Sequence, residues 1–396
     1  MDGSGQGAFA ETPAAMFGGV YAGKRVFVTG HTGFKGAWLT AWLLGLGAEV
    51  CGYSDRVPTQ PSLFELAGLE PRIRHVVGDV RDQARVAEAI ESFQPDVLFH
   101  LAAQAIVSTS YADPVGTIAV NAVGTACVMD ALRRLKQPCA AVIITSDKAY
   151  ENVEWPWGYR ETDRLGGRDV YSGSKGAAEL VFHAFHHSFF LRTDGAVRIA
   201  SARAGNVIGG GDWAADRIVA DCIRAWQAGR PVEIRSPRAT RPWQHVLEPL
   251  SGYLTLGAEL SRSADRHGES YNFGPRAEQN ASVLELLTDL AGVWGMPADQ
   301  AFRVTGDIPF HEAGLLKLNC DKALLELRWR PTLDYGECVR LTGGWYREVL
   351  REGADAQALT AAHIATYQDI AMRERQAWTG EAKGALAPQA AEMVGA

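Results

Sequence analysis

The feature that most constrains this chain is a glycine-rich turn between a short apolar run and an amphipathic stretch. The β-rich run 25–29 leads directly into GHTGFKG at 30–36, and Trp38 and Trp42 follow at helical spacing. Glycines at such a strand-to-helix turn let the backbone approach a pyrophosphate, and the helix N-terminus attracts its negative charge. A tight turn without a ligand is the less favoured interpretation. We expect dinucleotide contacts from Gly30, Thr32, Gly33, Phe34, Lys35 and Gly36.

Short β-rich runs alternate with longer segments of helical period up to about residue 204. Strands that alternate with helices indicate βαβ units and a parallel sheet. Several runs are apolar at every position, as expected when helices cover both faces of the sheet. The pattern predicts an α/β protein with a Rossmann-type doubly wound parallel sheet. The expected strands are 25–29, 49–53, 74–77, 97–101, 140–145 and 197–202.

After about residue 205 the alternation loosens, and Gly, Pro, Trp and Arg become frequent. We therefore predict a dinucleotide-binding domain over 23–204 that includes the catalytic residues. A smaller C-terminal α/β domain over 205–378 would mainly bind substrate. The Ala/Gly-rich ends, 1–22 and 379–396, are expected to be flexible.

Charge and cysteine usage limit the partners of the chain. Its 39 Lys+Arg and 46 Asp+Glu give a net charge of −7, which argues against a nucleic-acid footprint. No apolar run approaches the roughly 20 residues that span a bilayer, so no membrane association is expected. The six cysteines are widely scattered without a CxxC pair, as in a reduced cytoplasmic protein.

The end of the second expected strand bears on the choice of dinucleotide. The position of a ribose-binding acid holds Ser54, followed by Asp55 and Arg56. Asp55 can accept a hydrogen bond from a 2′-hydroxyl group, whereas Arg56 suits a 2′-phosphate. These residues leave NAD and NADP open.

A tyrosine and a lysine four residues apart carry the expected chemistry. Tyr171 and Lys175 share one face of a helix, so the ammonium group can lie near the phenol. A nearby positive charge lowers the pKa of a phenol and makes it a better proton acceptor. Tyr171 is therefore the predicted acid/base for a hydroxyl group, with Lys175 as its electrostatic support. An exposed helix pair without function is the alternative.

The GxxGxxG spacing and the Tyr/Lys pair resemble the extended short-chain dehydrogenase/reductase superfamily. The resemblance implies that Asp79 and Val80 contact the adenine end of the cofactor and that Lys175 also binds its ribose. It further implies that Ser146 shares the hydrogen bond of the reacting hydroxyl with Tyr171. The remaining implied cofactor contacts are Ser54, Leu101, Ala102, Ala103, Gln104, Asn121 and Tyr171.

An ionisable pair follows Ser146 and separates branches of this superfamily. Reductases and sugar epimerases usually carry small neutral residues there, whereas sugar-nucleotide 4,6-dehydratases carry two ionisable ones. This chain has Asp147 and Lys148. A salt bridge at the strand end is the alternative interpretation.

Longer segments are similar to the cytidine diphosphate-glucose 4,6-dehydratases. The most specific are TGHTGFKG at 29–36, ITSDKAY at 144–150, AGNVIGGGDW at 204–213 and RPWQHVLEPLSGY at 241–253. Ser108 stands where these enzymes often carry arginine, and Ile118 where tyrosine is common. The resemblance places Ser146, Asp147, Lys148, Tyr171 and Lys175 in the catalytic site. It places Asn206, Arg217, Arg241, His245, His311 and Glu312 in the sugar-nucleotide site, with NAD as cofactor and CDP-glucose as the favoured substrate.

The implied reaction is an internal redox elimination. C4 of the sugar is oxidised with Tyr171 as proton acceptor, water leaves across C5 and C6, and the hydride returns to C6. Asp147 would protonate the departing oxygen and Lys148 would take the C5 proton. A nucleotide-sugar 4-epimerase would need no pair after Ser146, and a non-catalytic dinucleotide sensor would not need Tyr171 or Lys175.

Two further expectations concern assembly and metals. In related enzymes, helices matching Tyr171 to about Phe190 and Val120–Leu135 pair with their copies as a four-helix bundle, so a homodimer is expected. His183, His186 and His187 fall on one helix without an acidic partner nearby. A packed or solvated helix face is favoured there, and no metal site is predicted.

Overall fold

The computed structural model describes residues 16–380 except 192–194, 235 and 306–314. Its centre is a seven-stranded sheet in the order β11-β6-β5-β4-β1-β2-β3, and all neighbouring strands are parallel. The α/β prediction is confirmed. The strands are β1 Arg25–Thr29, β2 Glu49–Ser54, β3 Arg74–Val77, β4 Val97–His100, β5 Cys139–Ile144, β6 Val197–Ala204 and β11 Ser270–Phe273.

Six of these strands match the expected runs to within one or two residues, but β11 was not expected. It pairs with β6 from Ser270↔Ser201 to Phe273↔Ala204. The segment after residue 204 therefore extends the main sheet as well as building its own small sheets. Those are β7 Val207–Ile208 with β10 Gln244–His245, β8 Val232–Ile234 with β13 Phe302–Val304, and β9 Thr240–Arg241 with β12 Ala281–Ser282.

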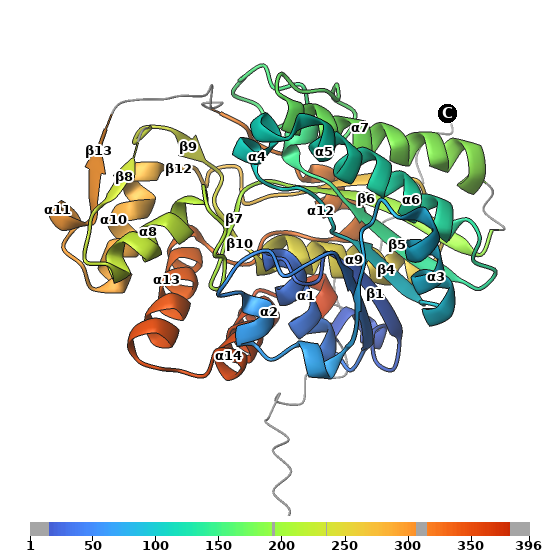
Figure 1. Cartoon of the computed structure of the whole chain (residues 1–396), viewed down its shortest axis with the longest axis horizontal. Helices are drawn as coiled ribbons and strands as arrows, with labels where there is room; N and C mark the ends of the chain where they lie inside the picture. Colours follow the sequence, from blue (N-terminus) through green and yellow to red (C-terminus); the bar gives the residue numbers. More distant parts are fainter. Residues whose placement is uncertain (1–15, 192–194, 235, 306–314, 381–396) are drawn as a thin grey trace, which may run out of the picture.

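Two helical layers cover the sheet (Figure 1), and β1 shows why its strands are apolar throughout. Val26 and Val28 pack in one buried cluster with α1 and α9, whereas Phe27 packs in the other with α3, α6 and α7. Successive strand residues point to opposite faces, so both sets must be apolar. The longer helices are α1 Phe34–Gly45, α3 Gln83–Phe93, α6 Gly124–Leu132, α7 Val170–Phe185, α8 Ile218–Gln227, α9 Leu247–Arg262, α10 Val283–Trp294, α13 Tyr335–Arg351 and α14 Ala356–Arg373.

Shorter helical elements connect these layers. The segments Ala119–Val123 and His186–Phe190 are π-helical continuations before α6 and after α7. The short α-helices are α2 Leu63–Leu66, α4 Val107–Ala112, α5 Pro114–Ile118, α11 Ala298–Ala301 and α12 Asp321–Leu327, and the 3₁₀ segments are Met16–Gly19, Glu70–Arg72, Asp147–Ala149 and Ala377–Thr379.

The prediction of a flexible N-terminus is wrong for residues 16–22. Phe17 is 2% exposed and stacks on Trp378 with ring centroids 4.9 Å apart, and it meets Trp42 edge-on. Tyr21 is also buried and donates a hydrogen bond to the Leu254 carbonyl. The aromatic contacts outweigh the Gly- and Ala-rich composition that suggested fraying.

One described stretch, Pro114–Leu132, is long and apolar enough to cross a membrane by length and composition, with a mean hydropathy of 1.5. The expectation that no run approaches that length is wrong for this stretch. Within the protein, 61% of it is buried, and its α5 and α6 parts contact α7 and α3. These properties are those of a core helix.

Candidate active site

The glycine turn after β1 is built by backbone packing. Gly30 has a φ of +73°, and a Cβ atom there would lie 2.7 Å from the Ala102 nitrogen. A Cβ on Gly36 would lie 2.1 Å from the Gly30 oxygen. Gly33 precedes α1 without a side-chain cap, so backbone N–H groups of the first turn remain for a ligand. The turn therefore fits the pyrophosphate of a dinucleotide.

Polar side chains next to this turn bond to one another. Ser54 at the end of β2 lies 3.1 Å from Nδ1 of His31, and Nε2 of the same ring lies 2.7 Å from Nδ1 of His75. Burial lowers the pKa of His31 to about 3, so its ring is neutral. Asp55 and Arg56 form only a long, exposed ion pair of 3.9 Å. These contacts do not distinguish NAD from NADP.

The other expected cofactor residues lie at the carboxyl ends of the neighbouring strands. Asp79 follows β3 and accepts hydrogen bonds from Arg81, which hold the pKa of the carboxyl below its ordinary value. Val80 is buried next to Gly124. Ala102 donates its N–H to Thr29 Oγ1, which fixes the loop 101–104 to the end of β1.

Asn121 connects the same loop to α7 by hydrogen bonds. Its Oδ1 accepts the Gln104 N–H at 2.8 Å, and its Nδ2 donates to Ser174 Oγ at 2.8 Å. Asn121 is 2% exposed, so these bonds are shielded from water. Its visible role is to position the loop and the helix.

The catalytic helix α7 begins one residue before Tyr171. Asp169 caps it by accepting the Ser172 N–H at 2.9 Å. Lys175 lies on the Tyr171 face, with Nζ 6.0 Å from the ring centroid. Burial lowers the pKa of Lys175 to about 8, and the Glu179 carboxylate opposes that shift.

The phenol of Tyr171 differs from the expectation. Burial raises its pKa to about 12, although the positive charge of Arg217 and a hydrogen bond with Ser146 act in the opposite direction. Loss of hydration therefore outweighs the nearby charges in the protein alone. The leading cationic influence on the phenol is Arg217 rather than Lys175.

Residues 145–150 follow β5 directly and carry three of the predicted catalytic residues, so we call this segment the catalytic turn. Ser146 Oγ donates to Asp147 Oδ1 at 2.9 Å and accepts the Lys148 N–H at 3.2 Å. Asp147 is 4% exposed, and burial raises the pKa of its carboxyl despite the charge of Lys148. A carboxyl with a raised pKa holds its proton more readily and can act as an acid.

Lys35 reaches from the glycine turn toward the same centre. Its Nζ lies 3.5 Å from the Tyr253 hydroxyl on α9. Burial and the charge of Arg217 lower the pKa of Lys35 to about 7, and Asp147 opposes the shift. The sequence placed Lys35 with the cofactor, and the structure also brings it close to the catalytic turn.

The structure describes four of the six residues expected to bind the sugar nucleotide, and one of these four is fully buried. Arg217 directly precedes α8 and donates to the Ala105 carbonyl at 3.3 Å, and Asn206 lies half-buried between β6 and β7. Arg241 is half-buried in β9. His245 lies apart, since it is fully buried beside Trp38, and burial lowers its pKa to about 3. His311 and Glu312 lie outside the described residues.

The two departures from the dehydratase pattern lie on neighbouring helices. Ser108 in α4 donates a hydrogen bond to Asp216, which directly precedes Arg217. Ile118 ends α5 and is 45% exposed. Ser108 thus contacts the segment that carries Arg217, and Ile118 presents an apolar surface.

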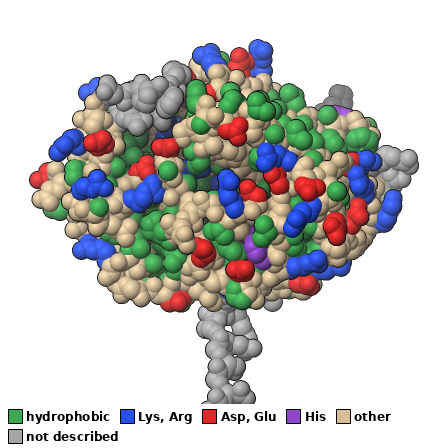
Figure 2. All heavy atoms as spheres, in the orientation of Figure 1, with side chains coloured by type: hydrophobic (Ala, Val, Ile, Leu, Met, Phe, Trp, Pro, Cys, Tyr) green, Lys and Arg blue, Asp and Glu red, His purple; other side chains and the backbone are tan. Residues whose placement is uncertain are grey.

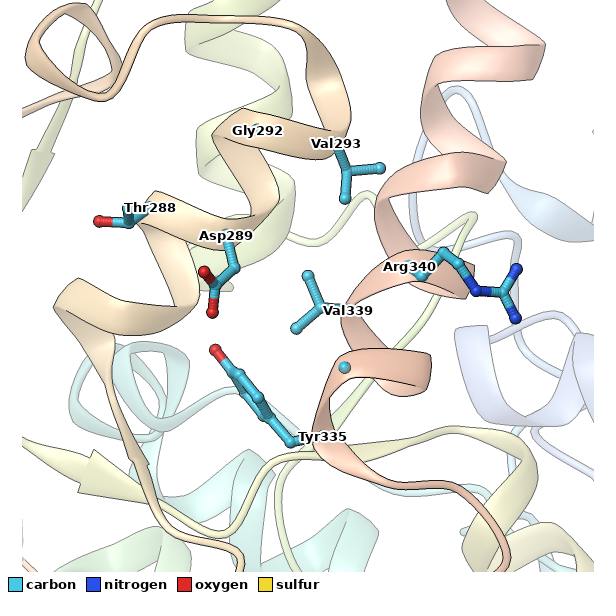
Figure 3. A pocket seen from close by; sticks show the side chains of 8 residues that line it. Thr288, Asp289, Gly292, Val293, Tyr335, Val339 and Arg340 are labelled. Atoms are coloured by element: carbon cyan, nitrogen blue, oxygen red, sulfur yellow. The ribbon is translucent and has the colours of Figure 1, made fainter.

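A separate hollow lies between α10 and α13 (Figure 3). The Tyr335 phenol points toward Asp289 across it. None of the expected site residues lines it. Its lining is Thr288, Asp289, Gly292, Val293, Tyr335, Gly336, Val339 and Arg340.

Sequence reasoning missed a buried polar cluster behind the catalytic turn, formed by Glu179, Arg203, Tyr150 and Asn272. The sequence feature that could have indicated this cluster is the acidic residue Glu179, which lies one helical turn beyond Lys175 on a largely apolar helix face. Across the described residues, no group of three or more His, Cys, Asp or Glu side chains is placed to hold a metal ion.

Comparison with known proteins identifies the family. The family described as GDP-mannose 4,6 dehydratase matches residues 27–342. A CDP-glucose 4,6-dehydratase from Salmonella typhimurium is 43% identical over 356 residues, covering 89% of this chain and 98% of the relative. A dTDP-glucose 4,6-dehydratase from Xanthomonas campestris is 25% identical over 81% of this chain and 92% of that one.

A solved structure of a dTDP-glucose 4,6-dehydratase from Streptomyces venezuelae, with NAD and TYD bound, has the same fold. Its TM-score is 0.71 at 23% identity, covering 84% of this chain and 99% of that one. The family match and the Salmonella relative extend over most of the chain, including both the glycine turn and the catalytic turn. This chain therefore belongs to the nucleotide-sugar 4,6-dehydratase family of the extended short-chain dehydrogenase/reductase superfamily.

Proposed function

We propose that the chain is an NAD-dependent CDP-glucose 4,6-dehydratase that forms the 4-keto-6-deoxy sugar. The observation that carries the proposal is the buried Asp147, with a raised pKa and a hydrogen bond to Ser146, in the turn beside Tyr171. An epimerase needs no acid at this position. The choice of CDP-glucose rests on the name of the 43% identical Salmonella relative.

Oxidation at C4 is assigned to Tyr171 with Ser146. The phenol accepts the proton of the C4 hydroxyl, and Ser146 orients that hydroxyl. Because burial raises the pKa of Tyr171 to about 12, the nearby cations must assist its deprotonation. Arg217 and Lys175 supply that positive charge.

Elimination is assigned to Asp147 and Lys148. The 4-keto group acidifies the C5 hydrogen, Lys148 takes that proton, and Asp147 donates a proton to the departing C6 oxygen. As the hydride returns to C6, the proton held by Lys148 returns to C5. The proton that Tyr171 took from the C4 hydroxyl replaces the one that Asp147 gave to the departing oxygen, so water is the only group lost. A general acid of this kind contributes about 10²–10⁴ in rate.

The cofactor is proposed to lie along the glycine turn. Gly30, Gly33 and Gly36 would hold the pyrophosphate, and the loop 101–104 with Lys175 would hold the nicotinamide ribose. When bound, NAD supplies the hydride acceptor and donor that the two redox steps require. Asp55 is proposed to accept the ribose 2′-hydroxyl, and Arg56 is the residue that would favour NADP instead.

The nucleotide end of the substrate is assigned to the segment after residue 204. Arg217 and Arg241 have the fork-shaped guanidinium group that suits diphosphate oxygens. The charge of Arg217 also lowers the pKa of the Tyr171 phenol, so this arginine is proposed to link the diphosphate to the reacting sugar. Asn206, His311 and Glu312 remain proposed sugar contacts, whereas the burial of His245 favours a packing role.

The decisive experiment is incubation with NAD and, in turn, CDP-, dTDP-, UDP- and GDP-glucose, followed by mass analysis. The proposal expects loss of one water, fastest with CDP-glucose, and no net formation of NADH. An unchanged mass with altered configuration would indicate an epimerase, and no turnover would favour a sensor. Replacing NAD with NADP in the same assay tests the cofactor.

We also propose a homodimer. The sequence pointed to α7 and the helix near Val120–Leu135, but α6 is buried at all positions except Ala126, so we assign the interface to α4, α5 and α7. Hydrophobic side chains gather over α5 and α7 (Figure 2). Contiguous exposed apolar surface of this kind marks an interaction site, and a two-fold arrangement would let the patch cover its own copy. The exposed apolar residues of this region are Val107, Tyr111, Val115, Ile118, Val123, Leu180, Phe189 and Leu191.

Light scattering at micromolar concentration tests this assembly. Wild-type protein should have the mass of a dimer, and Val115→Glu, at a side chain 76% exposed, should shift it toward the monomer. Leu325→Glu is a matched control, because Leu325 is 81% exposed on α12 outside the patch. A wild-type monomer would contradict the dimer.

A cytoplasmic location is proposed from the cysteines. All six are free, and five of them are buried. Proteins of oxidising compartments usually pair their cysteines. The net charge of −7 likewise argues against nucleic acid as a partner.

A further inference from the structure

An ion pair without any exposed side-chain surface lies behind the catalytic turn. Glu179 comes from α7 and Arg203 from β6, and both side chains are 0% exposed. Arg203 donates from Nε to Oε1 and from Nη2 to Oε2 of Glu179, each at 2.9 Å. Paired parallel bonds of this type fix the relative orientation of both groups.

The same ion pair holds both ends of the catalytic turn. Thr145 Oγ1 donates to Oε1 of Glu179, and Arg203 Nη1 donates to the Tyr150 hydroxyl at 2.7 Å. The residues between these two anchors include Asp147 and Lys148. Asp147 and Lys148 therefore lie between two residues, Thr145 and Tyr150, that the same buried ion pair holds in place.

Tyr150 is also held from a second side. Its hydroxyl donates to Asn272 Oδ1 in β11 at 2.8 Å. The Asn272 amide nitrogen donates in turn to the carbonyls of Tyr159 and Asn319. The Arg203 guanidinium lies 4.9 Å from the centre of the Tyr150 ring. The phenol thus joins the turn to β6 and to the last strand of the sheet.

The ion pair reaches the oxidation residues along α7. Glu179 lies one helical turn beyond Lys175 and two beyond Tyr171, so the three share a face. The Glu179 carboxylate opposes the burial that lowers the pKa of Lys175. One ion pair thereby contacts the elimination turn directly and supports the oxidation helix.

We propose that Tyr150 and Thr145 are positioning residues for the elimination step, acting through the buried Glu179–Arg203 pair. Neither is assigned to touch substrate. They set where Asp147 and Lys148 stand relative to the sugar held by Tyr171. This inference deepens the proposed function and rests on it.

The test is Tyr150→Phe, which removes one hydroxyl and keeps the ring. Arg203 Nη1 retains the Glu161 carbonyl as an acceptor at 2.9 Å, so the variant should fold. Displacement of a reacting group by about 1 Å can cost about a hundredfold in rate. In a single turnover with CDP-glucose and NAD, we expect elimination to slow by about tenfold to a hundredfold, with C4 oxidation nearly unchanged.

Rapid quenching and mass analysis separate the two steps. Tyr150→Phe should accumulate a 4-keto-glucose nucleotide that retains its C6 oxygen, together with the absorbance of reduced nicotinamide. Thr145→Val removes the other anchoring hydroxyl at nearly constant volume. Because Thr145 directly precedes Ser146, which is assigned to C4 oxidation, this variant should slow both steps, with the larger loss in elimination.

Tyr21→Phe is the matched control. It also removes a hydrogen bond from a phenol that is 1% exposed, but this phenol lies before β1 and donates to Leu254 in α9. The variant should leave the ratio of the two rates unchanged. If both variants of the turn keep the wild-type ratio, or lose both steps equally, the positioning role is wrong while the proposed function stands. A wild-type protein that does not dehydrate the nucleotide sugar would overturn the proposed function and this inference with it.

Discussion

Two turns meet at the reactive centre, and they are built in opposite ways. The glycine turn after β1 takes its shape from missing side chains, since a Cβ on Gly36 would lie 2.1 Å from a carbonyl oxygen. The catalytic turn after β5 is held by Thr145, Tyr150 and an ion pair from two other elements. A turn that offers backbone groups to a ligand can be specified locally. A turn that must aim two side chains needs support from distant parts of the chain.

The largest effect is expected from adding one methyl group to the glycine turn. Gly36→Ala should abolish both cofactor binding and turnover, and the overpacking should cost about 1–3 kcal/mol of stability. Equilibrium dialysis with NAD and thermal unfolding measure the two effects. Gly292→Ala in α10 is the control, because its Cβ would meet no atom within 4 Å. If Gly36→Ala binds NAD normally, the backbone argument for this turn fails.

The next effect isolates the acid of the catalytic turn. Asp147→Asn should leave C4 oxidation in place and slow elimination by about 10²–10⁴, because an amide cannot supply the proton. With excess substrate, a 4-keto-glucose nucleotide that keeps its C6 oxygen should accumulate, as mass analysis would detect. Tyr171→Phe gives the contrasting result, since it should stop oxidation and accumulate nothing. If Asp147→Asn dehydrates the substrate at nearly the wild-type rate, Asp147 is not the acid, and the salt bridge at the strand end is the better interpretation of Asp147 and Lys148.

Lys148→Met sharpens the assignment of the base. If Lys148 takes the C5 proton, the variant should slow elimination by about 10²–10⁴. It should also stop exchange of the C5 hydrogen with solvent deuterium, which Asp147→Asn should preserve. Deuterium incorporation by NMR distinguishes the two variants. Normal exchange in Lys148→Met would assign the base to another group.

The smallest effect concerns stability. Burial raises the pKa of Asp147 in the folded protein, so its contribution to stability is fully present below its unfolded pKa and is lost as pH rises through the folded pKa. Asparagine cannot ionise. Thermal unfolding should therefore show Asp147→Asn gaining stability relative to wild type between acidic and neutral pH, by about 1.4 kcal/mol per unit of pKa shift. A difference that stays constant with pH would contradict the raised pKa.

The contrast between the turns also explains what the sequence could predict. The glycine turn, six strands of the main sheet and the common helix face of Tyr171 and Lys175 depend on spacing within a few residues, and the structure has each of these local geometries. The Glu179–Arg203 pair joins residues 24 positions apart on different elements, so no local pattern contains it. Strand β11 was missed for the same reason, because it pairs with β6 although β6 ends at Ala204 and β11 begins only at Ser270.

Two other outcomes depended on burial, which local patterns do not fix. The sequence placed His245 near substrate, but the ring lies fully buried beside Trp38. It expected a nearby cation to lower the pKa of Tyr171, but burial raises that pKa to about 12. In both cases burial decided the property of the side chain.

The aromatic contact between the two ends of the described chain has a practical consequence for expression boundaries. Phe17 stacks on Trp378, and both rings pack against Trp42 of α1. A recombinant protein that starts at residue 23, where the first predicted domain begins, would lack Phe17. Trp42 and Trp378 would then lose an aromatic contact. Clones intended for crystallisation should therefore begin before Met16 and end after Gly380, so that both partners of this aromatic contact are kept.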